Sequence, residues 1–95
     1  HIERCRLLLI LLDMAGVDGR YPSDDYTHLL EELRLHSPEI IAKPRLVAAN
    51  KMDLTESVAN LKRFKRRHRV EIAPISAAKG EGLDNLLNLL KQKVL

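Results

Sequence analysis

Short apolar runs alternate with longer amphipathic stretches along the chain, and this pattern predicts the order of its strands and helices. Residues 7–12 are apolar at every position and are bounded by Arg6 and Asp13. A continuous apolar run of this length is typical of a parallel-sheet strand buried on both faces, and we expect such a strand here. Residues 45–49 and 70–75 are predicted to form the second and third strands.

Three helices are predicted where apolar residues recur every three or four positions. The first is expected at residues 22–36 with Ser23 as its N-cap, and the second at residues 55–67 with Thr55 as its N-cap. The third follows a glycine-containing turn at residues 80–82. The predicted inward faces are Tyr26, Leu29, Leu30 and Leu33 in the first helix, Val58, Leu61 and Phe64 in the second, and Leu83, Leu86, Leu87, Leu90 and Val94 in the third.

The alternation of strands and helices indicates an α/β fold. Three strands joined through helices are expected to run parallel in one sheet, as a layered structure. In open parallel sheets, ligands bind beyond the carboxyl ends of the strands. The loops that follow the three predicted strands are therefore the first places to look for a functional site.

The loop after the second predicted strand carries an amide, an ammonium and a carboxylate within four residues, Asn50-Lys51-Met52-Asp53. We interpret it as a guanine-selective loop. Asp53 can accept hydrogen bonds from N1–H and from the exocyclic N2 amine of guanine, whereas adenine has no donor at N1. A site built to pair polar edges discriminates by several powers of ten, on the order of 10⁴.

The loop after the third predicted strand, Ser76-Ala77-Ala78-Lys79, is small and begins with a hydroxyl. Adjacent parallel strands would bring it to the same edge of the sheet as the first loop. Small side chains let backbone N–H groups approach a ligand closely. A backbone N–H from Ala77 or its neighbour is expected to donate to the guanine O6, which adenine lacks.

Length, charge and cysteine content limit the other functions of the chain. Its 95 residues allow at most one small domain, and no apolar run approaches the ~18 residues of a membrane span. The single Cys5 cannot form an internal disulfide, which suits the cytoplasm. The net charge is only +3, with six of the sixteen basic residues between Lys62 and Arg69, so we expect no DNA partner. The chain begins at His1 without a Met, and we expect it to be part of a longer protein.

Asn-Lys-x-Asp after a strand, followed one strand later by Ser-Ala, resembles the base-recognition motifs of the Ras-like, P-loop GTPase superfamily. Residues 1–6, 38–45 and 47–54 more specifically resemble the Obg (CgtA) family of GTPases. The resemblance covers nearly the whole chain. It implies a three-layer P-loop NTPase-type fragment, with three parallel strands alternating with three helices. Residues 1–95 would form the C-terminal half of the family's GTPase domain.

The resemblance also implies a role for each position of the two motifs. Asn50 would hold the N7/O6 edge of the base and brace the neighbouring loops. Lys51 would lay its aliphatic stem on the base face, and Asp53 would read N1 and N2. Ser76 would orient Asp53 or its loop, and the Ala77 N–H would donate to O6.

Ala78, the position after Ser76-Ala77, belongs to the same guanine-binding loop but departs from the Ras-type pattern. Many Ras-type relatives have Lys directly after Ser-Ala, whereas this chain has Ala78 there and Lys79 one residue later. A stacking role for Lys79 is therefore not assigned. Asp13, at the end of the first strand, is expected to have a turn or capping role rather than a ligand contact.

Catalytic elements are absent from these residues. The sequence contains no Gly-x-x-x-x-Gly-Lys-Ser/Thr phosphate loop and no Asp-x-x-Gly switch segment. We therefore expect no catalytic residue and no metal ligand here, and place the Mg²⁺ ligands in a missing N-terminal half. The first strand should present an unpaired edge where that half would dock.

Two functions remain open at this point. By resemblance, the complete protein would bind GTP and GDP, hydrolyse GTP with Mg²⁺ and act in large ribosomal subunit assembly, while this fragment alone is inactive. The alternative is a non-catalytic basic α/β module that binds ribosomal RNA or a protein partner through residues 62–69.

Overall fold

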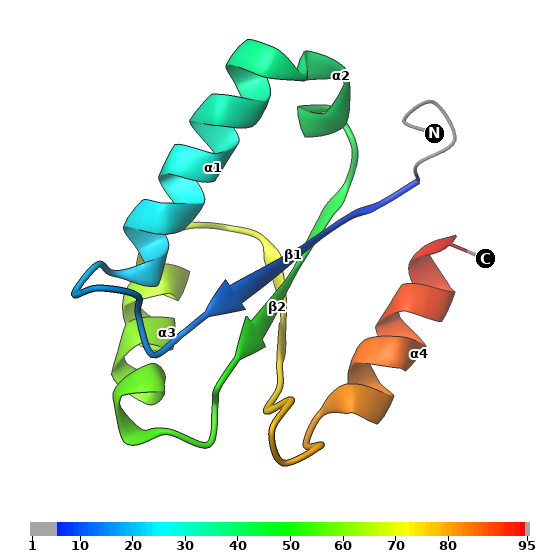
Figure 1. The fold of residues 1–95 in the computed structure, drawn as a ribbon. Coiled ribbons are helices and arrows are strands. Elements are labelled where there is room, and N and C mark those ends of the chain that lie inside the picture. The colour runs from blue at the N-terminus through cyan, green and yellow to red at the C-terminus, as the bar shows by residue number, and fades with distance from the viewer. Residues whose placement is uncertain (1–5, 95) are drawn as a thin grey trace.

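The computed structural model describes residues 6–94, so Cys5 and the rest of the resembling stretch at residues 1–5 lie outside the described part. Strands and helices alternate as the apolar pattern predicts, with one short helix in addition (Figure 1). The elements are β1 (Leu8–Asp13), α1 (Pro22–His36), α2 (Pro38–Ile41), β2 (Arg45–Asn50), α3 (Thr55–Arg67), β3 (Glu71–Pro74) and α4 (Leu83–Val94).

The three strands form one parallel sheet in the order β1-β2-β3. This confirms the predicted α/β fold, with parallel strands connected through helices. The register places Asp13 opposite Asn50, and Ala49 opposite Pro74. The carboxyl ends of all three strands therefore lie at the same edge of the sheet, where the polar loops begin.

One face of the sheet is covered by α1 and α3, which lie together on the side opposite to α4 (Figure 1). Alternate residues of β1 and β2 point toward these helices and are buried against them. The aromatic rings of Tyr26 and Phe64 meet edge to face there, with their centroids 5.2 Å apart. The buried cluster consists of Ile10, Leu12, Met14, Tyr26, Val47, Ala49, Leu61 and Phe64.

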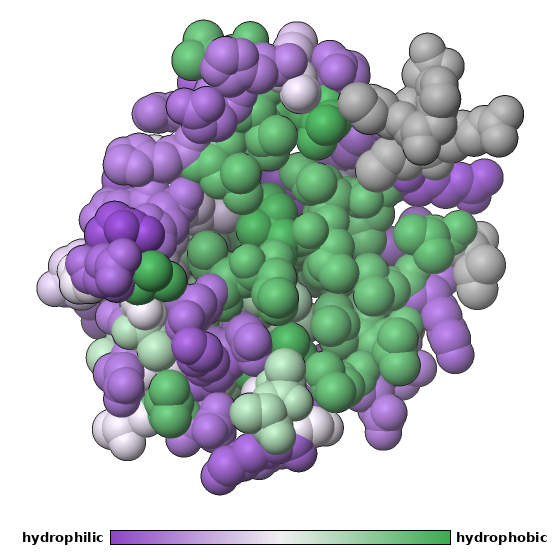
Figure 2. All heavy atoms as spheres, in the orientation of Figure 1, coloured by the Kyte–Doolittle hydropathy of each residue, from purple (hydrophilic) through white to green (hydrophobic). Residues whose placement is uncertain are grey.

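The other face of β1 is open, so the prediction of a strand buried on both faces is wrong. Leu9 is 43% exposed and Leu11 is 64% exposed. Figure 2 shows apolar residues gathered over the β1 edge and over the side of the sheet toward α4. The described part of α4 has no buried residue, although an ion pair of 2.5 Å joins Lys93 Nζ to Glu71 Oε1 of β3. β1 pairs with β2 alone among residues 6–94, which confirms the predicted free edge.

The predicted helix caps are wrong by one or two residues. Tyr21 is the N-cap of α1 and Leu54 is the N-cap of α3, both in extended conformation and without a side-chain cap hydrogen bond. Proline favours the first turn of a helix because its missing N–H has no partner there in any case. Pro22 therefore starts α1 ahead of Ser23, which becomes a buried residue within the first turn.

Four residues predicted to face inward lie at the margin of the core or outside it. Leu29 and Val94 are each 37% exposed, Val58 is 47% exposed and Leu87 is 53% exposed. The other predicted inward residues of the same helices are buried or half-buried. The short helix α2 was not predicted, because a single turn after Pro38 has no apolar period to reveal it.

Candidate functional site

Two polar loops meet at the carboxyl edge of the sheet, as their positions after β2 and β3 predict. The Ile75 N–H donates to the Ala49 carbonyl at 2.8 Å, and the Met52 N–H donates to the Ile75 carbonyl at 3.0 Å. The backbone pairing of β2 with β3 thus continues past the end of both strands. The Asn50–Asp53 segment and the Ser76 loop are consequently fixed relative to each other by main-chain bonds.

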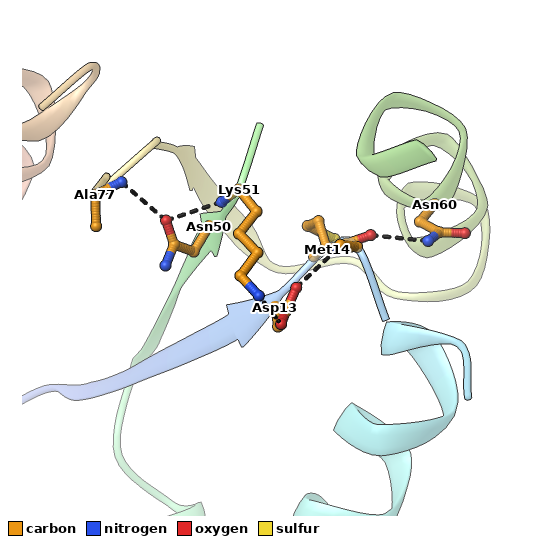
Figure 3. A network of polar contacts seen from close by, with 7 residues as sticks. Asp13, Met14, Asn50, Lys51, Asn60 and Ala77 are labelled. Carbon is orange, nitrogen blue, oxygen red and sulfur yellow. Dashed lines mark hydrogen bonds and ion pairs between the residues drawn. The ribbon is translucent and has the colours of Figure 1, made fainter. Parts of the chain in front are cut away.

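The Asn50 side chain bridges the two loops. Its Oδ1 accepts the Lys51 N–H at 2.8 Å and the Ala77 N–H at 3.0 Å (Figure 3). Because both partners are donors, the amide oxygen must face them, and the amide nitrogen must point the other way. Nδ2 has no acceptor within residues 6–94 and remains a free donor at the edge of the sheet. The bracing role that the resemblance implies for Asn50 is therefore present in the geometry.

The carboxylate of Asp53 is held from one side by Ser76. Ser76 Oγ donates to Asp53 Oδ1 at 2.9 Å and accepts the Lys79 N–H at 3.4 Å. Because the Lys79 N–H can only donate, the hydroxyl proton is left to point toward Asp53. Ser76 is 2% exposed while Asp53 is exposed, so a buried group orients a carboxylate that faces solvent. No residue of the described part bonds Asp53 Oδ2, which leaves this oxygen open to a ligand.

The loop after Ser76 is closed by two backbone hydrogen bonds with Glu81. The Ser76 N–H donates to the Glu81 carbonyl at 2.9 Å, and the Glu81 N–H donates back at 3.0 Å. Gly82 follows with φ +77°, and a Cβ there would lie 2.4 Å from the Pro74 carbonyl oxygen. Only glycine fits this close approach without displacing backbone, so the loop returns tightly against the end of β3.

Some backbone N–H groups of the Ser76 loop already donate to a protein acceptor, and others meet none within residues 6–94. The Ala77 N–H, predicted to donate to O6, donates to Asn50 Oδ1 instead and would be shared with a bound base. Its neighbour Ala78 is exposed, and its N–H meets no acceptor in the part of the chain that the structure describes. Lys79 is exposed and its ammonium forms no ion pair with residues 6–94.

Asp13 joins the site through Lys51, a contact that the sequence reasoning missed. Lys51 Nζ lies 2.8 Å from Asp13 Oδ2 (Figure 3). Asp13 Oδ1 accepts the Ala15 N–H at 2.9 Å. The expected turn role of Asp13 is therefore confirmed, and a second role is added. Asp13 ends the first apolar run as Asn50 ends the second, but the register that pairs these two residues is not determined by strands that are apolar throughout.

The basic residues 62–69 lie toward the opposite edge of the sheet. α3 starts directly after the Asn50–Asp53 loop and runs away from it. The guanidinium of Arg63 lies 4.0 Å above the Tyr21 ring, and Arg67 forms an ion pair with Asp24. The remaining basic residues of this block are exposed and have no ion-pair partner among the described residues: Lys62, Lys65, Arg66 and Arg69.

Two further features concern metals and membranes. Within residues 6–94, no three His, Cys, Asp or Glu side chains gather in a way that would hold a metal ion. None of the helices in this range has the length and apolarity needed to traverse a bilayer.

Comparison with known proteins gives a consistent set of relatives, although no protein-family model matches the chain. A protein named GTPase Obg from Opitutus terrae is 57% identical over 96 residues, covering 100% of this chain and 27% of that protein. Proteins of the same name from Roseiflexus castenholzii and Akkermansia muciniphila are 46% and 44% identical, and each alignment covers 99% of this chain. The chain spans about a quarter of the length of these relatives, 22–27%.

Proposed function

The chain belongs to the Obg family, and from this premise we propose that it is the guanine-recognition half of a GTPase domain. The complete protein would bind GTP and GDP and hydrolyse GTP to GDP. Residues 1–95 would form the C-terminal half of that domain. The free edge of β1 and the exposed Leu9 and Leu11 support this division, because another part of the protein would cover them.

The observation that carries the proposal is the pairing of the two loops through Asn50 and Asp53. A free acceptor, Asp53 Oδ2, and two free donors, Asn50 Nδ2 and the Ala78 N–H, lie on loops already tied together by hydrogen bonds. Guanine offers donors at N1 and N2 and acceptors at O6 and N7, which complements this set. Adenine would place its N6 amine against donors and would leave the carboxylate without a partner, which is unfavourable in a desolvated site.

Hydrolysis would depend on other parts of the protein. The phosphate loop and the switch segment are not among these residues, and the described residues form no metal site. We therefore place the Mg²⁺ ligands outside residues 6–94. These residues would select the base and hold it, and no step of hydrolysis is assigned to them.

A base series tests the proposal in the full-length protein. Binding of GDP, IDP and ADP is measured by calorimetry under one set of salt conditions. IDP retains N1–H and O6 but lacks the N2 amine, so it loses one hydrogen bond to a charged group, worth about 1.5–3 kcal/mol or roughly 10- to 150-fold in affinity. ADP should bind weakest of the three. Equal affinity for GDP and ADP would refute guanine recognition.

A second function is supported by the exposed basic residues in the second half of α3 and directly after its end. We propose that the protein is cytoplasmic and acts in large ribosomal subunit assembly, with Lys62, Lys65, Arg66 and Arg69 contacting ribosomal RNA phosphates. The alternative is a non-catalytic module that binds no nucleotide. Its function would consist only of binding ribosomal RNA or a protein partner. Replacing the four residues with Gln should reduce the slope of RNA affinity against salt concentration. An unchanged slope would exclude the contact.

A further inference from the structure

Asp13 and Lys51 are brought together by the register of β1 and β2. Asp13 is opposite Asn50, so Lys51 leaves the end of β2 directly beside the Asp13 carboxylate. The 2.8 Å contact between Lys51 Nζ and Asp13 Oδ2 joins side chains that are 49% and 26% exposed. The other carboxylate oxygen accepts the Ala15 N–H at 2.9 Å, a second contact that holds the orientation of the Asp13 carboxylate.

The backbone end of Lys51 is fixed as well. Lys51 has φ +66°, a left-handed conformation that is rare for a residue with a side chain. Its N–H donates to Asn50 Oδ1, and the next N–H, that of Met52, donates to Ile75. Figure 3 shows the lysine side chain running toward Asp13, while the Asn50 amide oxygen reaches the other way to Ala77. The aliphatic stem is thus held at both ends across the edge of the sheet.

We propose that Asp13 is a positioning residue for guanine binding, which acts by anchoring the Lys51 ammonium. The anchored stem presents an extended apolar surface to one face of the base. An unanchored lysine samples many rotamers, and ordering them on binding lowers the affinity. The inference rests on the proposed function, and it assigns to Asp13 a contribution to affinity without a contact to the nucleotide.

A double-mutant cycle in the full-length protein tests the inference. Asp13→Asn keeps an oxygen for the Ala15 N–H but removes the charge that holds the ammonium. Asp13→Asn should weaken GDP binding by about three- to fivefold, the effect of a partly exposed ion pair. In the Lys51→Met background, which keeps an apolar stem without an ammonium, the same substitution should have no further effect. Asp13→Glu, which restores a carboxylate, should recover most of the affinity.

The matched control is Asp18→Asn. Asp18 lies five residues further along, its side chain is 86% exposed, and its replacement removes the same charge. GDP affinity should be unchanged there. Equal weakening by Asp13→Asn in the Lys51 and Lys51→Met backgrounds, or no weakening in either, would overturn the inference. The GDP and ADP affinities of the unmodified protein distinguish failure of this inference from failure of the proposed function. Equal affinity for GDP and ADP would overturn the proposed function itself.

Discussion

The Asn50 side chain has two parts, the oxygen Oδ1 that bridges the two loops and the nitrogen Nδ2 that is a free donor within residues 6–94. Substitutions that remove one or both parts test whether they have separate roles in GDP binding. In Asn50→Asp, an oxygen remains to accept the Lys51 and Ala77 N–H groups, but the Nδ2 donor is replaced by a second oxygen. In Asn50→Ala, both the bracing oxygen and the donor are lost. The first variant should therefore damage base contact alone, and the second should damage base contact and loop order together.

The magnitudes follow from the two bracing hydrogen bonds, which are 2.8 and 3.0 Å long. At this partly exposed position each contributes about 0.5–1 kcal/mol, and the lost base contact adds about 0.5–1.5 kcal/mol. Asn50→Ala should thus weaken GDP binding by about 1.5–3.5 kcal/mol, roughly 10- to 400-fold. Asn50→Asp loses the donor and places a negative charge near the O6 and N7 acceptors, which should cost about 1–3 kcal/mol.

Two assays on the full-length protein distinguish the variants. Calorimetry with GDP gives the affinities, and hydrogen exchange of the peptide that contains Ala77 reports the bracing bond. Exchange in the nucleotide-free protein should be faster in Asn50→Ala and close to wild type in Asn50→Asp. Faster exchange in both variants, or GDP binding by Asn50→Asp within about twofold of wild type, would refute the separation of roles.

Three further predictions concern the loop, the core and the division of the domain. Gly82→Ala should lower the thermal unfolding temperature more than Gly80→Ala. Both positions have positive φ, but only at Gly82 would the Cβ meet backbone, 2.4 Å from an oxygen. The clash and strain at Gly82 should cost at least about 2 kcal/mol, and equal losses of unfolding temperature in the two variants would contradict the geometry. Burial raises the pKa of Tyr26, against an opposing effect of Arg45. The contribution of Tyr26 to the free energy of unfolding should therefore be constant below about pH 10 and fall above it by up to about 1.4 kcal/mol per pH unit. Denaturation curves of Tyr26→Phe should lack this part of the fall, those of the exposed control Tyr21→Phe should retain it, and an identical fall in all three proteins would contradict it. The isolated residues 1–95 should release no phosphate from GTP and Mg²⁺ above blank, and release above blank would contradict the assignment of hydrolysis to other parts of the protein.

The meeting of the two loops could be predicted because it depends on topology alone. Parallel strands bring their carboxyl ends to one edge, so Asn50 and Ser76 are expected to lie close together when the second and third strands are neighbours in the sheet. The structure confirms this proximity through Asn50 Oδ1 and Ala77. That guanine binds there stays a prediction.

Other features could not be predicted because they depend on what covers each surface. The run at residues 7–12 is apolar on both faces, yet Leu9 and Leu11 are exposed in the described part of the chain. Apolar residues on both faces of this strand are typical of a strand covered on both sides, and residues 6–94 cover only one side. The contact between Asp13 and Lys51 depends on the strand register, which hydrophobic periodicity does not determine to the residue when a strand is apolar throughout.

The most direct test of the central claim, that Asp53 selects guanine, is the base preference of Asp53→Asn in the full-length protein. An Asn amide can accept from N1–H and donate to the 2-oxo group of xanthine, whereas it opposes the N2 amine of guanine. Two hydrogen bonds to a carboxylate are replaced by one hydrogen bond to a neutral amide oxygen, which should weaken GDP binding by about 2–5 kcal/mol, at least about 30-fold, while XDP binding increases. Asp84→Asn, which changes an exposed carboxylate in the first turn of α4, is the matched control and should leave both affinities unchanged. A reversal of preference from GDP to XDP in Asp53→Asn is the predicted result, and an unchanged preference for GDP would contradict the account.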